Sequence, residues 1–278
     1  IMKFTKMEGC GNDYIYINCF EETVDNPQQL AIMMSERHFG VGADGIVLIM
    51  PSDKADFRMR MFNADGSEGE MCGNASRCLG KFVYDKGLTN KTRISMSTLA
   101  GIKYLELHIK NGVVDTVTVD MGEPIFEGRK IPTTSNKQFV QKELLHSEDK
   151  TFEMTCVSMG NPHAVTYVEN TDDFPVEKYG KPLEVHDFFP NKTNVEFVQV
   201  IDRNHLKMRV WERGSGETMA CGTGACGVVV ATAKNGICER EVDVMLLGGT
   251  LHIKWDEKDN HIYMTGEARF CFDGQWLK

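Results

Sequence analysis

Apolar residues alternate with polar ones, or form short β-branched runs, at intervals along most of the chain. This pattern predicts strands at residues 15–17, 45–50, 57–62, 104–109, 113–119, 194–201, 205–211, 242–247 and 251–255. Residues 73–86 and 222–235 are rich in small and apolar side chains and end at Gly87 and Gly236, as helices with left-handed caps do. A helix without a polar face is usually buried, so the pattern favours an α/β fold in which curved sheet encloses each helix. For the polar stretch 133–150 we expect an exposed loop or a variable helix.

The chain repeats itself at a constant offset. The motif GNDY at 11–14 resembles GNPH at 160–163, and CGNAS at 72–76 resembles CGTGA at 221–225, an offset of 149 residues (221 − 72 = 149). Gly87 and Gly236, and Asn111 and Asn260, keep the same offset. We infer two homologous halves. The predicted domains are residues 1–118, with 267–278 as a candidate to complete the last strand, and residues 119–266.

Composition and charge exclude several classes of protein. With 41% hydrophobic and 26% charged residues, the chain has the make-up of an ordinary globular protein. A net charge of −9 and the lack of a Lys/Arg-rich run argue against binding to nucleic acid. No apolar stretch approaches the ~18–20 residues that span a bilayer, and residues 1–8 lack the apolar core of a signal peptide. We therefore expect a cytoplasmic protein with no nucleic-acid or membrane partner.

Two of the nine cysteines stand in a special context. Cys72 and Cys221 each follow a Gly-rich loop and open a predicted helix. Unpaired N–H groups and the positive end of the dipole at a helix start favour a thiolate, so we expect a lowered pKa for both thiols. The same N–H groups can hold a carboxylate. We expect the remaining cysteines to be core residues: Cys10, Cys19, Cys78, Cys156, Cys226, Cys238 and Cys271.

Each half thus supplies one activated thiol and one site for a carboxylate-sized anion. Two thiols facing each other across a cleft would remove a proton from one face of a carbon and deliver a proton to the other, which inverts the carbon. Two helix N-termini aimed at one carboxylate would stabilise the charge that develops. Structural zinc sites usually have spacers of two to four residues and a nearby His, whereas five residues separate Cys72 from Cys78 and no His stands near either cysteine pair. The loop 214–224 lacks the Gly-Lys-Ser/Thr ending of a phosphate loop. We expect no metal and no cofactor.

The cysteine motifs resemble those of a known family. Residues 63–77 (NADGSEGEMCGNASR) resemble the signature of diaminopimelate epimerases, and residues 216–225 (GETMACGTGA) resemble their second cysteine motif. Residues 9–14, 159–165 and 211–214 also resemble that family, so the resemblance runs nearly end to end. It implies a pyridoxal-independent epimerase that interconverts LL- and meso-2,6-diaminopimelate in lysine and peptidoglycan precursor biosynthesis. It further implies two pseudo-symmetric α/β domains, each a β-barrel around a central helix, with the active site in the cleft between them, and a homodimer.

The resemblance also implies roles for individual residues. Cys72 and Cys221 would be the catalytic acid/base pair, and His163 and Glu212 would tune the thiols. The guanidinium of Arg213 would bind a substrate carboxylate, while Asn amides would hold the remaining polar groups. The substrate-binding residues implied are Asn12, Asn63, Gly73, Asn74, Asn161, Asn194, Glu212, Arg213, Gly222 and Thr223. Gly45 stands where some members place a substrate-contacting Gln, so we expect that contact to be missing or replaced.

Other functions remain open on the residues alone. One alternative is a proline or hydroxyproline racemase, or an isomerase of the phenazine-synthesis type, on the same scaffold. A racemase of small substrates would not need Glu212, Arg213 and several Asn residues for a distal group, and the phenazine type would lack the cysteine pair. The alternative from another class is a non-catalytic thiol redox or metal-binding protein, which stoichiometric zinc would support.

Overall fold

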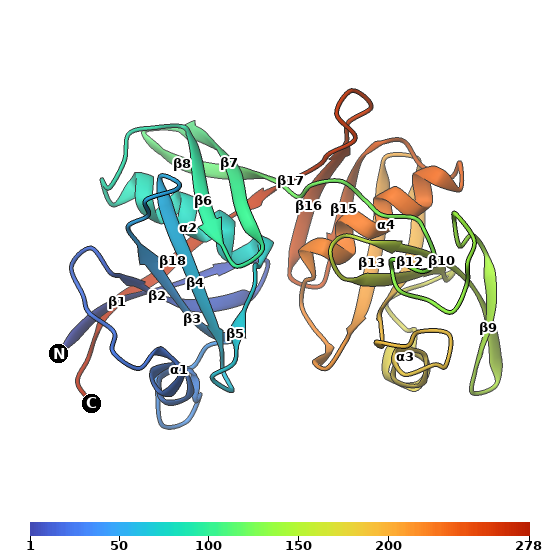
Figure 1. The fold of residues 1–278 in the computed structure, drawn as a ribbon, viewed down its shortest axis with the longest axis horizontal. Helices are drawn as coiled ribbons and strands as arrows, with labels where there is room; N and C mark the ends of the chain where they lie inside the picture. The colour runs from blue at the N-terminus through green and yellow to red at the C-terminus, as the bar shows by residue number, and fades with distance from the viewer. The chain divides into compact units, whose positions relative to one another are not determined.

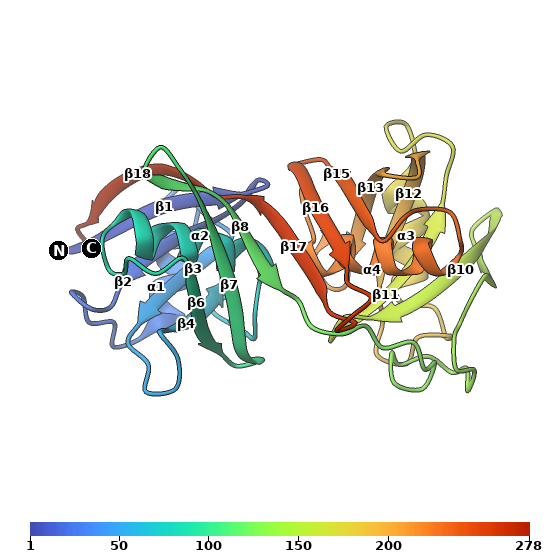
Figure 2. The ribbon, with the colours of Figure 1, turned by 90° about the horizontal axis from the view of Figure 1, so that it is seen from above.

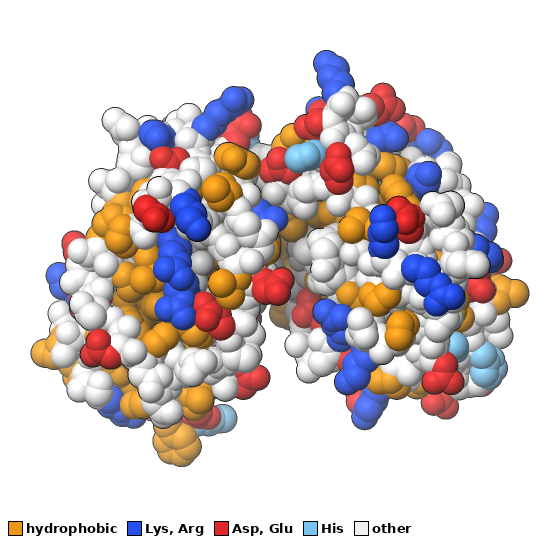
Figure 3. Space-filling model, in the orientation of Figure 1, with side chains coloured by type: hydrophobic (Ala, Val, Ile, Leu, Met, Phe, Trp, Pro, Cys, Tyr) orange, Lys and Arg blue, Asp and Glu red, His pale blue; other side chains and the backbone are white.

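The computed structural model describes all 278 residues, in four helices and eighteen strands (Figures 1 and 2). The chain divides into two compact units: Ile1–Asp120 with Thr265–Lys278, and Met121–Met264. None of the four helices has the length and apolar composition needed to cross a lipid bilayer. Acidic and basic side chains are interspersed on the visible face of each unit (Figure 3). The mixed α/β fold predicted from the sequence is confirmed.

The first unit is a mixed sheet around a buried helix. Its strands are β1 (Met2–Gly9), β2 (Asn12–Asn18), β3 (Gly45–Met50), β4 (Phe57–Asn63), β5 (Glu68–Gly69), β6 (Arg93–Thr98), β7 (Gly101–Lys110), β8 (Val113–Asp120) and β18 (Arg269–Trp276). β1 pairs antiparallel with β18 and β2, β2 runs parallel to β3, and β4 runs parallel to β6. The helix α2 (Gly73–Asp85) packs against β1, β2, β7 and β8, and α1 (Pro27–Ser35) packs against β3 and β4.

The second unit repeats this plan. Its strands are β9 (Glu143–Ser147), β10 (Lys150–Ser158), β11 (Pro162–Tyr167), β12 (Asn194–Asp202), β13 (His205–Glu212), β14 (Gly216–Glu217), β15 (Glu241–Leu246) and β16 (Gly249–Trp255). β11 runs parallel to β12 and β13 parallel to β15. The helix α4 (Gly222–Lys234) packs against strands β10, β11, β12, β15 and β16, and α3 (Val176–Glu184) packs against β9, β12 and β13. β17 (Ile262–Glu267) leads the chain back into the first unit.

The repeat extends to the pairing of individual residues. Tyr14 lies opposite Gly45 between β2 and β3, and His163 lies opposite Asn194 between β11 and β12. These pairs keep the offset found in the sequence, as do the first and last residues of α2 and α4. The two central helices therefore begin at equivalent places in the two sheets.

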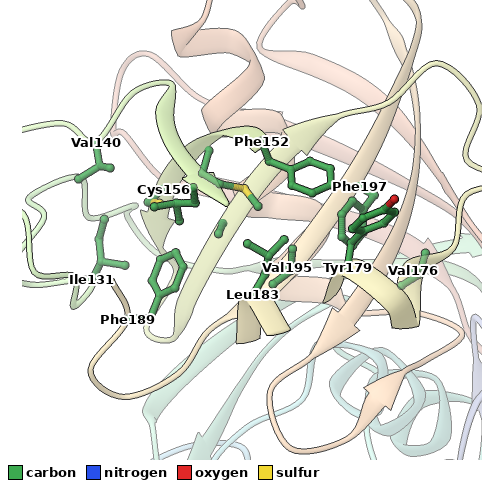
Figure 4. Packing of buried hydrophobic residues seen from close by; sticks show 13 residues of the cluster. Ile131, Val140, Phe152, Cys156, Val176, Tyr179, Leu183, Phe189, Val195 and Phe197 are labelled. Atoms are coloured by element: carbon green, nitrogen blue, oxygen red, sulfur yellow. The ribbon is translucent and has the colours of Figure 1, made fainter. Parts of the chain in front are cut away.

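Aromatic packing fixes the strands that lead to the second cysteine. Phe152, Tyr179 and Phe197 form a cluster in which α3 lies on the sheet (Figure 4). α3 approaches β13 so closely that a Cβ on Gly180 would lie 2.6 Å from the Cβ of Trp211. Glycine is therefore required at this contact. The close packing holds the end of β13, whose last residue is Glu212 and which Arg213 follows.

The predicted elements agree with the structure except in one stretch. All nine predicted strands lie within observed strands to within one residue. The two observed helices end at residues 85 and 234, one residue before their predicted ends. The interpretation of 133–150 as a helix is wrong, because this stretch contains β9, in which buried Leu145 and Ser147 alternate with exposed residues against β10.

Candidate active site

Each unit places one cysteine at the start of its central helix. Cys72 is the N-cap residue of α2 and Cys221 is the N-cap residue of α4, and both have extended backbones (φ −139° and −128°). Gly73 and Gly222 are the first residues of these helices and are buried. The first N–H groups of each helix, which have no intrahelical acceptor, therefore lie beside a thiol.

A polar network surrounds Cys72. The Oδ1 atom of Asn12 accepts hydrogen bonds from the Cys72 thiol at 3.2 Å and from the Asn74 amide at 3.3 Å. The Asn12 amide nitrogen in turn donates to Asp44 at 2.7 Å. Arg77, which is fully buried, donates to Asn74 Oδ1 at 2.9 Å. The structure thus brings Asn12 and Asn74 to the thiol, and adds Asp44 and Arg77, which were not among the predicted site residues.

Two further residues of the first unit lie near this network. The amide of Asn63, at the end of β4, donates to Ser67 Oγ at 3.1 Å in the turn between β4 and β5. Gly45 opens β3, where a Cβ would lie 2.1 Å from the carbonyl oxygen of Phe62. No side chain fits on this backbone, so residue 45 cannot supply the side-chain contact with substrate that the family resemblance implies at this position.

Cys221 lies in a more enclosed environment, with 8% of its surface exposed. Its sulfur accepts a hydrogen bond from the Gly224 N–H at 3.3 Å and lies 3.6 Å from Thr223 Oγ1. Burial raises the pKa of the Cys221 thiol well above its ordinary value, and the carboxyls of Glu212 and Glu196 add to the effect. The expectation of a lowered pKa is therefore wrong for Cys221, because desolvation outweighs the donors at the helix start.

A buried chain of polar groups leads away from this thiol. His163 is fully buried, with Nδ1 2.6 Å from Glu196 Oε1 and Nε2 3.0 Å from Asn161 Oδ1. The Asn161 amide nitrogen donates to Thr223 Oγ1 at 3.2 Å. Burial raises the pKa of Glu196, and His163 opposes that shift. The structure thus connects His163, Asn161 and Thr223 to Cys221, and adds Glu196, which the sequence analysis missed.

Glu212 is the last residue of β13, and Arg213 follows it. The Glu212 carboxyl hydrogen-bonds with the Cys221 thiol, and burial is the main cause that raises the pKa of Glu212. Asn194 Oδ1 accepts the Arg213 backbone N–H at 2.8 Å, while the Arg213 guanidinium donates to the Asn191 carbonyl at 3.2 Å. Asn194 therefore orients the turn that carries Arg213.

An ion pair of the same kind lies just before each cysteine in the sequence. Arg60 of β4 donates from Nε and Nη2 to the Glu68 carboxylate of β5 at 2.8 and 3.1 Å. Arg209 of β13 donates in the same way to Glu217 of β14 at 2.6 and 2.9 Å. These residues were not singled out from the sequence, although both pairs keep the offset of the repeat.

The other cysteines are mostly buried, as expected. Cys10, Cys78, Cys156, Cys226 and Cys238 are buried, and Cys19 is partly exposed. The prediction is wrong for Cys271, which is exposed because β18 turns most of its side chains outward at this point. No group of three or more His, Cys, Asp or Glu side chains is arranged to hold a metal ion.

A sequence profile of the family described as diaminopimelate epimerase matches residues 4–127 and 155–271. The chain belongs to that family. Proteins named diaminopimelate epimerase are 61% identical in Acetivibrio thermocellus (99% of this chain and 98% of the relative) and 59% identical in Methanococcus maripaludis strain C5 (99% of each). The relative of the same name in Agathobacter rectalis is 53% identical (99% of each). The chain is accordingly an enzyme of the isomerase class.

Solved structures of more distant proteins share the fold. A phenazine biosynthesis protein of the PhzF family from Bacillus anthracis superposes with a TM-score of 0.75 at 18% identity, covering 100% of this chain and 99% of the other. A hydroxyproline epimerase from Agrobacterium vitis superposes with a TM-score of 0.67 at 12% identity, covering 98% and 91%. At these identities the likeness shows the fold alone.

Proposed function

We propose that this enzyme interconverts LL- and meso-2,6-diaminopimelate without a cofactor, with Cys72 and Cys221 acting on opposite faces of one α-carbon. The observation that carries the proposal is the thiol at the start of each central helix, at equivalent positions of the repeat. The family's name supports the substrate. We further propose, from the family resemblance, a role in lysine and peptidoglycan precursor biosynthesis, a cytoplasmic location and a homodimer.

The environment of Cys221 suits a thiol that donates a proton. Its raised pKa keeps the group protonated in the substrate-free enzyme at neutral pH. Once the proton has left, the Gly224 N–H and the Thr223 hydroxyl remain beside the sulfur to stabilise the thiolate. Glu212, hydrogen-bonded to the same thiol, is placed to take part in restoring the proton.

The two helix starts suit the negative charge that forms when the α-proton is removed. In the proposed reaction the charge moves from the α-carbon onto the carboxylate, where the first N–H groups of α2 and α4 would bind it. Removing one such donor from an enzyme typically costs about 10²–10³ in kcat. Acid–base catalysis by each positioned thiol contributes about 10²–10⁴.

The far end of the substrate needs its own contacts, because diaminopimelate carries an amino-acid group at each end. The Arg213 guanidinium makes a single hydrogen bond to a carbonyl, so further N–H groups of its planar fork can bind a carboxylate. We propose Asn63, Asn161 and Asn194 as ligands of the remaining polar groups, together with Asn12 and Asn74 around Cys72. The experiment below tests this assignment by substrate choice.

The test is exchange of the α-hydrogen of LL-diaminopimelate in heavy water under reducing conditions. We expect exchange and formation of the meso isomer by the wild type and by Cys271→Ser, a control outside both cysteine networks. Cys72→Ser and Cys221→Ser should abolish both. No exchange by the folded wild-type enzyme would contradict the proposal. Exchange with L-proline or trans-4-hydroxy-L-proline in place of diaminopimelate would instead support a racemase.

A further inference from the structure

The strands that precede the two cysteines are too short to be stable through their own backbone hydrogen bonds. β5 and β14 contain two residues each and pair only with β4 and β13. No regular structure follows them: residues 70–72 and 218–221 lead directly to the helices. A two-residue strand contributes little stability. The position of each thiol before its helix therefore depends on other contacts of this hairpin.

The Arg60–Glu68 and Arg209–Glu217 pairs are the side-chain contacts of this kind that both units share; in the second unit the Met219 carbonyl also accepts the Gly248 N–H at 2.9 Å. Each is bidentate and joins a long strand to the short strand four residues before the cysteine. The side chains are 17–28% exposed, so water screens the pairs less than it screens surface ion pairs. The paired carboxylates raise the pKa of both arginines.

The repeat adds an independent argument. The residues aligned by the repeat differ at many positions of the two sites. Tyr14 of the first half aligns with His163 of the second, and Asn74 aligns with Thr223. The ion pair is the same in both halves, with the same donor atoms and the same register between the strands. A pair kept in both halves, each time beside a cysteine, points to a role shared by the two cysteines.

We propose that Arg60–Glu68 and Arg209–Glu217 are positioning pairs. Each fixes the segment between the short strand and one cysteine, and thereby sets the exposure and orientation of that thiol. Neither pair touches the sulfur, so the effect acts through residues 69–71 and 218–220. The bearing on catalysis rests on the proposed function, whereas the bearing on the thiols does not.

The two pairs are not equal in strength. Arg209 Nη1 also donates to the carbonyls of Thr171 and Phe174 at 2.8 and 2.9 Å, which joins the loop before α3 to the hairpin. Arg60 instead lies over the ring of Phe62, 5.0 Å from its centroid. Removal of the carboxylate should therefore loosen the first hairpin more completely than the second.

The experiment measures the rate at which iodoacetamide alkylates each cysteine of the substrate-free enzyme, by mass spectrometry of the two cysteine peptides. In Glu68→Ala we expect alkylation of Cys72 to rise about tenfold, the factor expected when a charge-assisted pair of about 1.4 kcal/mol is lost, while Cys221 stays at the wild-type rate. In Glu217→Ala we expect the reverse, with a smaller rise at Cys221. Glu239→Ala, which breaks an exposed ion pair with Arg203, is the control and should change neither rate.

A charge-swapped variant separates positioning from general loosening. Arg60→Glu combined with Glu68→Arg restores an ion pair and should return the Cys72 rate to within about twofold of the wild type, although each single change does not. In the epimerase assay, kcat of Glu68→Ala should fall while KM stays within about twofold, because the pair does not contact substrate.

Several results would overturn the proposal. Wild-type alkylation of both cysteines in folded Glu68→Ala and Glu217→Ala would do so, and so would an equal rise at both cysteines in either variant. If Glu217→Ala does not fold, Glu217→Gln, which removes the charge and keeps one acceptor, provides the same comparison. Because alkylation requires no substrate, a failure here is distinct from a failure of the exchange assay.

Discussion

Alkaline pH should destabilise the protein through its buried thiols, and Cys238 is one of them. Its side chain is 3% exposed, and burial raises the pKa of its thiol from 9.0 to about 12. Below pH 9 the thiol is protonated in both the folded and the unfolded chain, so its contribution to stability is fully present. Between pH 9 and 12 only the unfolded chain releases the proton. Stability is lost over this range at about 1.4 kcal/mol per pH unit for this one group.

Cys238→Ala removes the titrating group. The sulfur makes a single weak hydrogen bond, to the Val229 carbonyl at 3.9 Å, so the substitution should cost about 1 kcal/mol at pH 8 through the small cavity it leaves. The difference from the wild type should vanish near pH 10. At pH 11 the variant should be more stable by about 2 kcal/mol, since two pH units of the titration no longer apply.

The assay is urea denaturation followed by tryptophan fluorescence at pH 8, 9, 10 and 11, for the wild type, Cys238→Ala and Cys271→Ala. Cys271 is exposed, and desolvation raises the pKa of its thiol less than that of Cys238, so its substitution should change the pH dependence much less than Cys238→Ala does. A difference between the wild type and Cys238→Ala that stays constant, or widens, from pH 8 to 11 would refute the reasoning.

Two further predictions concern the geometry. Gly45→Ala should lower the free energy of unfolding by more than about 3 kcal/mol, because its Cβ would lie 2.1 Å from the Phe62 carbonyl oxygen. Gly69→Ala should lower it by less than about 1 kcal/mol, because its Cβ would meet only the flexible side chain of Met61 at 3.3 Å. Equal thermal stability of the two variants would contradict this prediction. Oxidation should inactivate the enzyme by joining the two proposed catalytic thiols in one disulfide, and mass mapping that finds any other pairing in the inactive protein would contradict that idea.

The central helices were predictable because their signals are local and repeated. A cysteine, a glycine and a small apolar run open α2 and α4, and Gly87 and Gly236 follow their ends with positive φ values of 78° and 73°. The strands of both sheets also carry local alternation. These local patterns therefore predict helices and strands without information about contacts with distant residues.

The two helices that the sequence analysis did not predict, α1 and α3, differ in how they are stabilised. α3 follows Pro175, contains Pro182 and is held by an aromatic contact between Tyr179 and Phe152, which lies far away in sequence. α1 could have been found, since Asn26 caps its first turn and Pro27 occupies the first helical position.

The residues proposed for the site stay a prediction, whereas the expected electrostatics of Cys221 differ from the structure. The helix-start argument considers only local donors, whereas the pKa of Cys221 follows from burial and from the carboxyls of Glu212 and Glu196. A signal for Glu196 was present: an acidic residue stands between Val195 and Phe197 in an apolar run. Such a residue is either exposed or paired in the core, and only the structure shows that His163 is its partner.

The most direct test of the two-thiol mechanism follows the isotope during the first turnovers. Wild-type enzyme converts LL-diaminopimelate in heavy water, and substrate and product are separated at low conversion. With Cys72 and Cys221 on opposite faces, the meso product should carry one deuteron at the inverted carbon while the remaining LL substrate carries almost none. Deuterium that enters the LL substrate as fast as the meso product, or product that retains the original α-hydrogen, would contradict a two-base mechanism.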